Sequence, residues 1–199
     1  MEQFWDERYA TSQFVYGKEP NAFLASELSK LKPGRILLPG EGEGRNAVHA
    51  AREGWKVDAF DQSRVGKEKA LAFASDMGVQ IQYKACPLEE FPFQDKRYDL
   101  VGLVFVHAPG PGRTYLHKQV SGTLLPGGMV LLEAFHMEQL GRNTGGPKSL
   151  DYLFDEEMLL SDFAGLTPVM LEKKLVRLNE GPFHQGEAAV IRYIGVKPK

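Results

Sequence analysis

The chain has 199 residues, of which 43% are hydrophobic and 25% charged, and its formal net charge is −2. These values are ordinary for a globular protein, and the length suits one domain whose core needs no disulfide support. The 24 basic and 26 acidic residues balance each other and are interspersed, so the composition argues against a nucleic-acid partner. Cys86 is the single cysteine and no apolar run reaches membrane-spanning length, so we expect a cytoplasmic protein with no membrane partner.

The first half of the chain alternates predicted strands and helices. The first twenty residues are rich in aromatic side chains without a clear period, and Asn21 can then cap a helix that ends at Pro33-Gly34. Apolar or alternating runs predict strands over residues 35–38, 55–61 and 79–85, with helical patterns between them over residues 45–54 and about 67–76. This order is typical of a parallel α/β sheet with right-handed crossovers.

The second half continues this pattern and then changes it. Strands are predicted over residues 98–107 and 129–135, with a helix over about 113–122 and the turn "LLPGG" between them. Residues 136–152 form a polar loop long enough to indicate a functional role, and residues 155–163 form a short helix. The runs 169–181 and 187–197 alternate and predict an antiparallel hairpin at the sheet edge, joined by "PFHQG". No linker or repeat divides the chain, so we predict one domain.

The segment "LPGEGEGRNA", residues 38–47, lies between the first predicted strand and the helix after it. Glycines at such a turn let a ligand lie against the backbone and the helix N-terminus, and Gly42, Gly44 and Ala47 match the dinucleotide spacing G-x-G-x-x-A. Asp61 ends the next predicted strand, about twenty residues later, where a carboxylate can accept hydrogen bonds from a ribose. The alternatives are a tight turn without a ligand and, for Asp61, the N-cap of the next helix.

Two ligands, NAD and S-adenosylmethionine, share this geometry. A pyrophosphate is disfavoured near Glu41 and Glu43, because like charges repel each other in a partly buried site. S-adenosylmethionine has no phosphate and carries a sulfonium and an ammonium group. The chain length also leaves little room for the separate substrate domain that dehydrogenases commonly have. These observations favour S-adenosylmethionine.

Five segments resemble the class I S-adenosylmethionine-dependent methyltransferases in order and spacing: "ILLPGEGEGRNAVHAA", "VDAFDQS", "KACPLEEFPF", "YDLVGLVFVHAP" and "LLPGGMVLLEAF". The resemblance covers about residues 4–196, and the opening "FWDERY…YGKEPNAFL" is similar, more narrowly, to the small tellurite-resistance-type methyltransferases. The resemblance implies an α/β, three-layer Rossmann-like fold with a seven-stranded, mostly parallel sheet and an antiparallel C-terminal hairpin strand. It also implies S-adenosyl-L-methionine as the cofactor.

The resemblance further implies which residues hold that cofactor. The three glycines would line its methionine and ribose side, Asp61 would hold the ribose hydroxyls, and Gln62 and Ser63 would flank the adenine. Leu38 stands where many relatives have an acid, and Glu41 is hypothesised to orient the amino group in its place. Pro87 stands where the family often has an acid at the adenine edge, so a contact there would use the backbone or Leu88. The full predicted set is Gly40, Glu41, Gly42, Gly44, Asn46, Asp61, Gln62, Ser63, Cys86, Pro87, Leu88 and Phe105.

The methyl acceptor is expected beyond the carboxyl ends of the strands. His107 as a base or hydrogen-bond donor, Arg113 as a group that attracts an anion, and Glu133 are the predicted catalytic residues. A structural histidine and a solvated arginine are the alternatives, and Glu133 needs a partner such as Arg45 or a ligand. Predicted substrate-side residues are Trp5, Arg8, Tyr9, Tyr16, His136, Arg142 and His184, with Lys148 in the same loop region; the four N-terminal ones form a lid over the cofactor or simply pack on the sheet.

The leading hypothesis is a methyltransferase that acts on a small-molecule acceptor: an oxyanion such as tellurite or selenite, or a thiol. An NAD-binding oxidoreductase and a non-catalytic S-adenosylmethionine-binding sensor are the alternatives. The histidines have no zinc-like spacing, so no metal site is predicted, and the protein is expected to be a monomer or homodimer. Within the single domain 1–199, residues 1–32 are predicted to form the lid and first helix, 35–135 the cofactor-binding core, and 136–199 the substrate-side loop, helix and hairpin.

Overall fold

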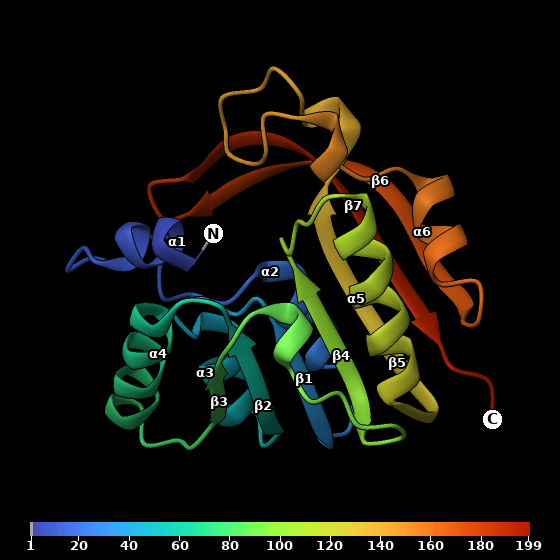
Figure 1. The fold of residues 1–199 in the computed structure, drawn as a ribbon, viewed down its shortest axis with the longest axis horizontal. Coiled ribbons are helices and arrows are strands. Elements are labelled where there is room, and N and C mark those ends of the chain that lie inside the picture. Colours follow the sequence, from blue (N-terminus) through green and yellow to red (C-terminus); the bar gives the residue numbers. More distant parts are fainter. Residues whose placement is uncertain (1) are drawn as a thin grey trace. The chain divides into compact units, whose positions relative to one another are not determined.

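A computed structural model of the protein describes residues 2–199, and its ribbon is drawn in Figure 1. The strands are β1 (Arg35–Pro39), β2 (Lys56–Asp61), β3 (Gln82–Ala85), β4 (Tyr98–Val104), β5 (Leu124–Phe135), β6 (Thr167–Glu180) and β7 (His184–Val196). The α-helices are α1 (Glu2–Tyr9), α2 (Ala22–Leu28), α3 (Arg45–Arg52), α4 (Arg64–Asp76), α5 (Gly110–Thr123) and α6 (Glu156–Asp162). Three short 3-10 helices are η1 (Leu88–Glu90), η2 (Met137–Gln139) and η3 (Leu150–Tyr152).

The strands form a seven-stranded sheet in the order β3-β2-β1-β4-β5-β7-β6. The β1/β2, β2/β3 and β4/β5 pairs are parallel, and β7 runs antiparallel to β5. The predicted fold class, a mostly parallel α/β sheet with an antiparallel C-terminal strand, is confirmed. The chain divides into two units, which are described separately: the first extends to Pro92 and includes Glu180–Pro182, and the second comprises Phe93–Asn179 and Phe183–Lys199.

The first unit contains strands β1, β2 and β3 and helices α1 to α4 (Figure 1). Its strands are in register at Leu37 with Asp58 and at Ala59 with Tyr83. The apolar run of β1 is buried, as its sequence predicts, and α3 and α4 pack against β1, β2 and β3. The predicted cap of α2 is also confirmed, because the Asn21 side chain accepts a hydrogen bond from the Leu24 amide at 2.9 Å.

Two features of the first unit differ from the prediction. Helix α1 forms over residues for which the sequence showed no clear period, and it packs against α4. Helix α4 begins at Arg64, earlier than the predicted Lys67, because the Ser63 hydroxyl caps it by accepting from the Gly66 amide at 2.9 Å. Asp6 of α1 in turn accepts a hydrogen bond from the Ser63 hydroxyl at 2.5 Å. The position of α1 therefore depends on contacts with residues far along the chain, whereas the early start of α4 rests on a local cap that Asp6 supports.

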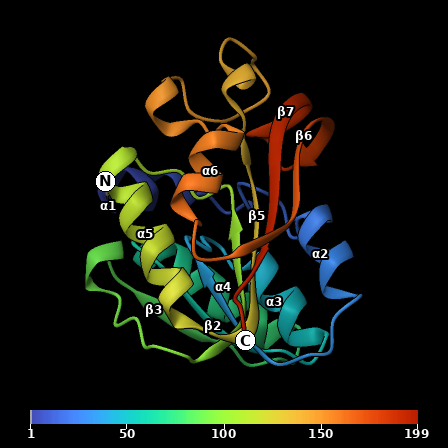
Figure 2. The same cartoon turned by 90° about the vertical axis from the view of Figure 1, so that its right-hand side faces the viewer.

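The second unit contains β4, β5, β7 and most of β6, together with α5 and α6, which pack against each other (Figure 2). The predicted "LLPGG" turn lies inside β5 instead of before it, and the pairing with β4 shifts register between Tyr98 and Leu100. The residues after β7 explain this difference. The Gly127 amide donates to the Lys197 carbonyl at 2.9 Å, and the Lys197 amide donates to the Gly128 carbonyl at 2.8 Å, so the turn residues join the sheet.

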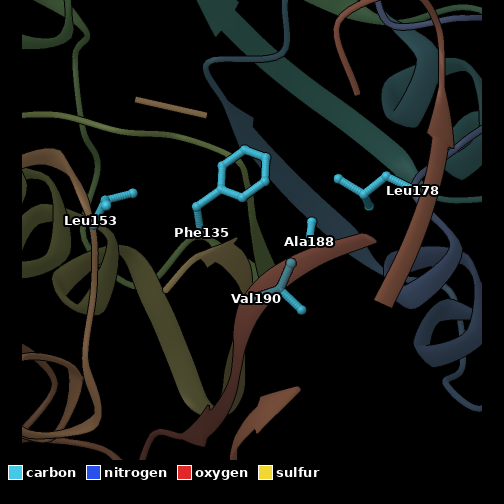
Figure 3. Close-up of a cluster of buried hydrophobic side chains, with 5 residues drawn as sticks. All are labelled: Phe135, Leu153, Leu178, Ala188 and Val190. Atoms are coloured by element: carbon cyan, nitrogen blue, oxygen red, sulfur yellow. The ribbon is translucent and has the colours of Figure 1, made fainter. Parts of the chain in front are cut away.

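A hydrophobic cluster occupies the end of the second unit where β5 meets β7 (Figure 3). Phe135, at the end of β5, is 1% exposed, and Figure 3 shows its ring among apolar side chains of β6, β7 and the loop after β5. The buried members are Phe135, Leu153, Leu178, Ala188 and Val190, with Phe105, Met137 and Val176 partly buried beside them. The predicted long loop 136–152 is therefore anchored to the core at its start and just after its end. Among residues 2–199, no helix combines the length and apolar character needed to cross a membrane.

Candidate functional site

The glycine turn of the first unit connects β1 to α3. Gly40, Gly42 and Gly44 have positive φ values of 60°, 60° and 89°, so each adopts a conformation that side chains disfavour. A Cβ on Gly44 would also come within 2.6 Å of Ala70 Cβ and 2.9 Å of Ala70 Cα, in the backbone of α4. A Cβ on Gly42 would lie 2.6 Å from the Tyr9 hydroxyl. The three glycines are thus required by this turn and by its close neighbours, independently of any ligand.

Glu41 is 8% exposed and caps the helix that follows the turn. Its Oε1 accepts from the amides of Asn46 (2.8 Å) and Ala47 (2.7 Å), and its Oε2 accepts from Asn46 Nδ2 at 3.4 Å. Burial raises the pKa of Glu41 to about 7, against the opposing effect of these hydrogen bonds. Both oxygens therefore accept hydrogen bonds from the first turn of α3, and the role of Glu41 as the replacement for the acid missing at Leu38 stays a prediction.

Asp61, at the end of β2, is 8% exposed and holds the same turn from the other side. Its Oδ2 accepts from the Gly42 amide at 3.0 Å, and its Oδ1 accepts from the Ser63 amide at 2.8 Å. The Gln62 amide is a third backbone donor, and because a carboxylate offers about four acceptor positions, Asp61 keeps capacity for a further hydrogen bond. Burial raises the pKa of Asp61 to about 6, while these backbone donors oppose the rise. The N-cap of α4 is Ser63, so Asp61 does not have the capping role that was its alternative.

The remaining predicted cofactor residues of the first unit lie around Asp61. Asn46 is buried in the first turn of α3, and its Oδ1 accepts from the Asn21 amide at 2.9 Å. The Cys86 amide donates to the Asp61 carbonyl at 2.9 Å, which places Cys86 directly beyond the ends of β2 and β3. Gln62, Pro87 and Leu88 are partly exposed next to these residues. Phe105, also predicted to contact the cofactor, belongs to the second unit.

The N-terminal segment covers the turn within the first unit. Tyr9 is 4% exposed, stacks on Trp5 with ring centroids 5.6 Å apart, and has its hydroxyl against Gly42. Burial raises the pKa of Tyr9 well above its ordinary value. Arg8 donates to the Tyr16 hydroxyl at 3.2 Å, so the four predicted lid residues form two contacting pairs. The lid and the packing interpretations both remain compatible with this arrangement.

The second unit brings His107, Phe105, Phe135 and His184 together. The His107 and Phe135 rings stack with centroids 5.6 Å apart, and the Phe105 ring lies 4.6 Å from Phe135 and 4.7 Å from His184. Phe105 has a φ of 52°, a strained value for a non-glycine residue. Strand β4 therefore ends at Val104, three residues before the predicted end at residue 107. Backbone strain of this kind is concentrated at functional sites.

Arg113 is held by an acid of α6. Its Nε donates to Asp162 Oδ2 at 2.7 Å, and the same oxygen lies 2.8 Å from His117 Nδ1. Burial lowers the pKa of His117, while the hydrogen bond to Asp162 and its charge raise it. Hydrogen bonds from His117 and Arg113 lower the pKa of Asp162 despite its burial. Arg113 thus connects α5 to α6, and attraction of an anion would have to compete with this ion pair.

Glu133 of β5 has a different partner from the one suggested by the sequence. Its Oε2 accepts from Arg192 Nε of β7 at 2.6 Å, and Glu133 is 2% exposed. Arg45, the suggested partner, instead donates to Glu180 Oε2 at 2.8 Å in the first unit. Cross-strand pairing explains the difference, because Glu133 and Arg192 are directly opposite in the β5/β7 register.

The other predicted substrate-side residues of the second unit are spread over the loop after β5. His136 Nδ1 accepts from the Glu138 amide at 3.1 Å and so caps η2. Arg142 pairs with Glu187 at 2.9 Å, and Lys148 Nζ donates to the Arg142 carbonyl at 3.3 Å. His184 is 6% exposed and lies under Gly145, whose added Cβ would come within 2.7 Å of the His184 ring. Of these residues, His184 contacts the histidine and phenylalanine cluster through its ring, which lies 4.7 Å from Phe105 and 5.2 Å from Phe135.

Several residues that shape these sites were not predicted. In the first unit the Tyr83 hydroxyl donates to the Gly42 carbonyl at 2.7 Å, and Lys69 forms an ion pair with Glu43. In the second unit the Tyr152 carbonyl accepts from His107 Nδ1 at 2.6 Å. The alternation in β3 could have placed Tyr83 on a buried face, but a backbone carbonyl carries no sequence signal. Within the described residues 2–199, no group of three or more histidine, cysteine or acidic side chains has a metal-binding arrangement.

The fold and the glycine turn define a class of protein, and comparison with known proteins agrees with it. Residues 36–128 match the family described as methyltransferase domain. The matched residues include the glycine turn and most of β1 to β4, so this part of the chain resembles a methyltransferase domain, and S-adenosylmethionine is the methyl donor of that class of enzyme. The resemblance stated from the sequence is confirmed at this level.

Curated proteins and solved structures with similar sequences or folds were also found. A ubiquinone biosynthesis O-methyltransferase from Alkalilimnicola ehrlichii is 33% identical over 135 residues, which are 66% of this chain and 50% of that protein. The chain spans half or less of the length of the curated relatives it matches. A solved structure described by the conversion of a disulfide bond into a thioacetal group during echinomycin biosynthesis has a TM-score of 0.79 at 18% identity, covering 100% of this chain and 93% of that one. TehB from Haemophilus influenzae has a TM-score of 0.74 at 14% identity, covering 98% and 66%.

Proposed function

We propose that this protein transfers a methyl group from S-adenosylmethionine to a small-molecule acceptor. The observation that carries the proposal is the glycine turn of the first unit, held between Asp61 and Tyr83 with the Gly42 backbone at its centre. Asp61 at the end of β2 keeps acceptor capacity for a hydroxyl group of a ribose. The proposed contacts of the adenosine part are Asp61, Gln62 and Ser63, with Cys86, Pro87 and Leu88 at the adenine edge.

The acids around the turn support this donor over a dinucleotide. Glu41, Glu43 and Asp61 are all at most 8% exposed within the first unit. A pyrophosphate would add two negative charges to this set, whereas S-adenosylmethionine brings positive charge. Glu43 is already neutralised by Lys69 and accepts from the Val15 amide at 2.7 Å, so it stabilises the N-terminal segment. The oxidoreductase alternative is not favoured. An assay for turnover distinguishes an enzyme from a non-catalytic sensor, because a sensor would bind S-adenosylmethionine without transferring its methyl group.

The acceptor is proposed from the chemistry of the second unit and from the relatives. The name of the curated relative, an O-methyltransferase of ubiquinone biosynthesis, suggests a hydroxyl group, and the resemblance to the tellurite-resistance-type methyltransferases suggests tellurite. We include a thiol and the oxyanions tellurite and selenite among the acceptors to be tested. His107, Arg113 and Glu133 remain the predicted catalytic residues, and Trp5, Arg8, Tyr9, Tyr16, His136, Arg142 and His184 the predicted substrate-side ones.

The single domain with parts 1–32, 35–135 and 136–199 likewise remains a prediction, as do the cytoplasmic location, the monomeric or homodimeric state and the absence of nucleic-acid and membrane partners. All of these can be checked on the purified full chain. Size-exclusion chromatography with light scattering would report the oligomeric state directly.

Asp61→Asn tests the proposed cofactor site. We expect the Kd for S-adenosylhomocysteine to rise about 10- to 100-fold by calorimetric titration, because one hydrogen bond to a charged acceptor contributes roughly 1.5–3 kcal/mol. Asp76→Asn, at the exposed end of α4, is the matched control and should bind normally. Unchanged affinity in Asp61→Asn, or wild-type protein that binds NADH and not S-adenosylhomocysteine, would contradict the proposal.

A further inference from the structure

Strand β6 is an exposed edge strand. Within residues 2–199 it is the last strand of the sheet, with β7 as its strand neighbour (Figure 1), so its other edge has no strand beside it. Most of β6, residues 167–179, belongs to the second unit and is longer than most strands. Its side chains Val169 and Leu175 are 67% and 53% exposed. A long edge with exposed apolar side chains is a surface on which another strand can pair.

The side chains of β6 alternate between the two faces of the sheet. Val176 packs against the hydrophobic cluster of the second unit, and Glu172 lies 3.7 Å from Arg192 of β7, so the even-numbered side chains share the face that is packed. The odd-numbered side chains, including Leu175, lie on the opposite face. A strand that pairs with β6 must keep both faces in phase, because a slip of one residue would exchange them.

The middle of β6 has nearly the same character in both directions around Lys173. The segment "MLEKKLV", residues 170–176, has two apolar residues at each end, an acid before the central lysine and a base after it. Two copies of this segment can therefore run antiparallel with Lys173 opposite Lys173 and all other opposite residues matched in kind. Each matched pair occurs twice: Glu172 with Lys174, Leu171 with Leu175, and Met170 with Val176.

The charges of β6 favour this register over its neighbours. Lys173 donates to Glu138 Oε1 at 2.6 Å, so each of the two central ammonium groups already has an acidic partner. Glu172 and Lys174 of one chain are 3.9 Å apart, with side chains 41% and 51% exposed, and both can instead pair with their counterparts in the second strand. A shift of two residues in either direction would place Glu172 opposite Glu172 or Lys174 opposite Lys174, and like charges that are directly opposite destabilise a strand pair.

The same charges select the kind of strand that can pair. Lysines on an edge strand discourage pairing with other chains, because an arbitrary strand leaves them without a matching acid. A second copy of β6 supplies that acid, since its Glu172 is opposite Lys174, and it covers Leu171 and Leu175 with apolar side chains. Charge and apolar character are therefore complementary to β6 itself.

We propose that β6 is the interface of a homodimer, in which two copies of the strand pair antiparallel about a twofold axis centred on Lys173. The same strand contributes both sides of the interface, so the two sheets join edge to edge and the assembly closes as a dimer. Backbone hydrogen bonds and the apolar pairs supply the affinity, while Glu172 and Lys174 determine the register. This inference does not rest on the proposed methyl transfer.

Charge reversal tests the interface. Sedimentation equilibrium of the full chain over a range of concentrations gives the dimer Kd of the wild-type protein, Lys174→Glu, Glu172→Lys and the control Lys118→Glu, an exposed residue of α5. Each reversal in β6 places like charges opposite each other twice, so we expect the dimer Kd to rise at least about tenfold in either variant. It should stay unchanged in Lys118→Glu. An equimolar mixture of Lys174→Glu and Glu172→Lys restores both acid–base pairs and should form a heterodimer with nearly the wild-type Kd.

Three results would overturn the inference: a wild-type protein that stays monomeric up to about 1 mM, a dimer Kd that neither reversal changes, or folded variants that do not associate when mixed. Thermal unfolding shows whether Glu172→Lys, which loses its approach to Arg192, is folded.

Amide hydrogen exchange gives a second measure that does not need Glu172→Lys. Amides within residues 170–176 of the wild-type protein should exchange more slowly above the dimer Kd than below it, because the paired edge is protected. Lys174→Glu at the same high concentration should lose this protection. Equal exchange of the wild-type segment at both concentrations would contradict pairing through β6.

Discussion

The two units of this protein bury ionisable side chains in different ways. In the first, the carboxyl groups of Glu41 and Asp61 accept hydrogen bonds mainly from backbone amides, and burial raises their pKa values to about 7 and about 6. In the second, Glu133 is paired with a guanidinium group, while His107 has a pKa lowered to about 4. Burial favours the neutral form in both units, but an acid becomes neutral by keeping its proton and a histidine by losing it.

This difference separates the roles of the two units. Carboxyl groups that are held by the backbone fix the shape of a turn and leave acceptor positions for a ligand with hydroxyl groups. In the second unit, the His107 ring lies among aromatic rings, and its Nε2 accepts a hydrogen bond from the Phe135 amide at 3.5 Å. The comparison therefore supports the proposed recognition of the cofactor by the first unit.

The largest effect is expected from an added methyl group in each unit. Gly44→Ala places a Cβ against the α4 backbone at a φ of 89°, and Gly146→Ala places one 2.8 Å from the Phe135 ring at a φ of 84°. Urea denaturation should show a loss of about 3 kcal/mol for each, from overpacking plus backbone strain. Gly44→Ala should also weaken S-adenosylhomocysteine binding, whereas Gly146→Ala should not.

Gly78→Ala is the matched control, because its φ of 68° is also positive but nothing lies within 4 Å of the added Cβ. It should lose about 1 kcal/mol, from backbone strain alone. Equal weakening of cofactor binding by Gly44→Ala and Gly146→Ala would remove the division of roles between the units.

A smaller effect is expected from neutralising the buried acid of the second unit. Glu133→Gln keeps the shape of the side chain but removes the charge opposite Arg192, so we expect unfolding free energy to fall by about 2 kcal/mol. Glu172 lies 3.7 Å from Arg192 and offsets part of the lost interaction. The control Glu187→Gln, whose exposed pair with Arg142 contributes little, should change stability by about 0.5 kcal/mol or less. Loss of turnover in a Glu133→Gln protein of unchanged stability would instead show a direct catalytic role.

The smallest effect is the pH dependence of stability, which has opposite signs in the two units. Folded Glu41 binds a proton up to about pH 7, whereas the unfolded residue loses it near 4.5, so its stabilising contribution is complete below pH 4.5 and is lost as the pH rises to 7. Folded His107 is neutral down to about pH 4, whereas the unfolded residue is protonated below 6.5, so its contribution is complete above pH 6.5 and is lost as the pH falls to 4.

Two substitutions separate these contributions. Between pH 5 and pH 6.5, Glu41→Gln should make the slope of unfolding free energy against pH more positive and His107→Gln should make it more negative. Each change should be about 1 kcal/mol per pH unit, measured by denaturation in urea at fixed ionic strength. Slopes that shift in the same direction would show that burial does not act on the two groups as described.

Local patterns predicted most of the elements. The apolar run of β1, the alternation of β2 and the Asn21 cap of α2 correspond to elements in the structure, because each depends on residues that are neighbours in the chain. Helix α1, the early start of α4 and the inclusion of the "LLPGG" residues in β5 were not predicted. Helix α1 and the "LLPGG" residues depend on partners far along the chain, such as Ser63 for Asp6 and Lys197 for Gly127, whereas α4 starts at a local Ser63 cap.

The candidate sites divide in the same way. The glycine spacing and Asp61 could be read from the sequence, since a tight turn and a strand end restrict which residue types can occupy them. The partners of charged groups could not be predicted from the sequence, because many oppositely charged residues are available. For Glu133, the choice between Arg45 and Arg192 depends on the register of β5 and β7. The role of Glu41 as a helix cap likewise depends on side-chain geometry.

The sequence by itself determined the order of strands and helices, the glycine turn and the class of the domain, because these follow from local conformational preference and side-chain spacing. The tertiary structure alone decided that Glu41 accepts from the Ala47 amide, that Asp61 accepts from the Gly42 amide, and that His107 Nδ1 donates to the Tyr152 carbonyl. These outcomes depend on hydrogen bonds to backbone groups, and a backbone amide or carbonyl is the same at nearly every residue. Its position becomes specific only when the chain has folded.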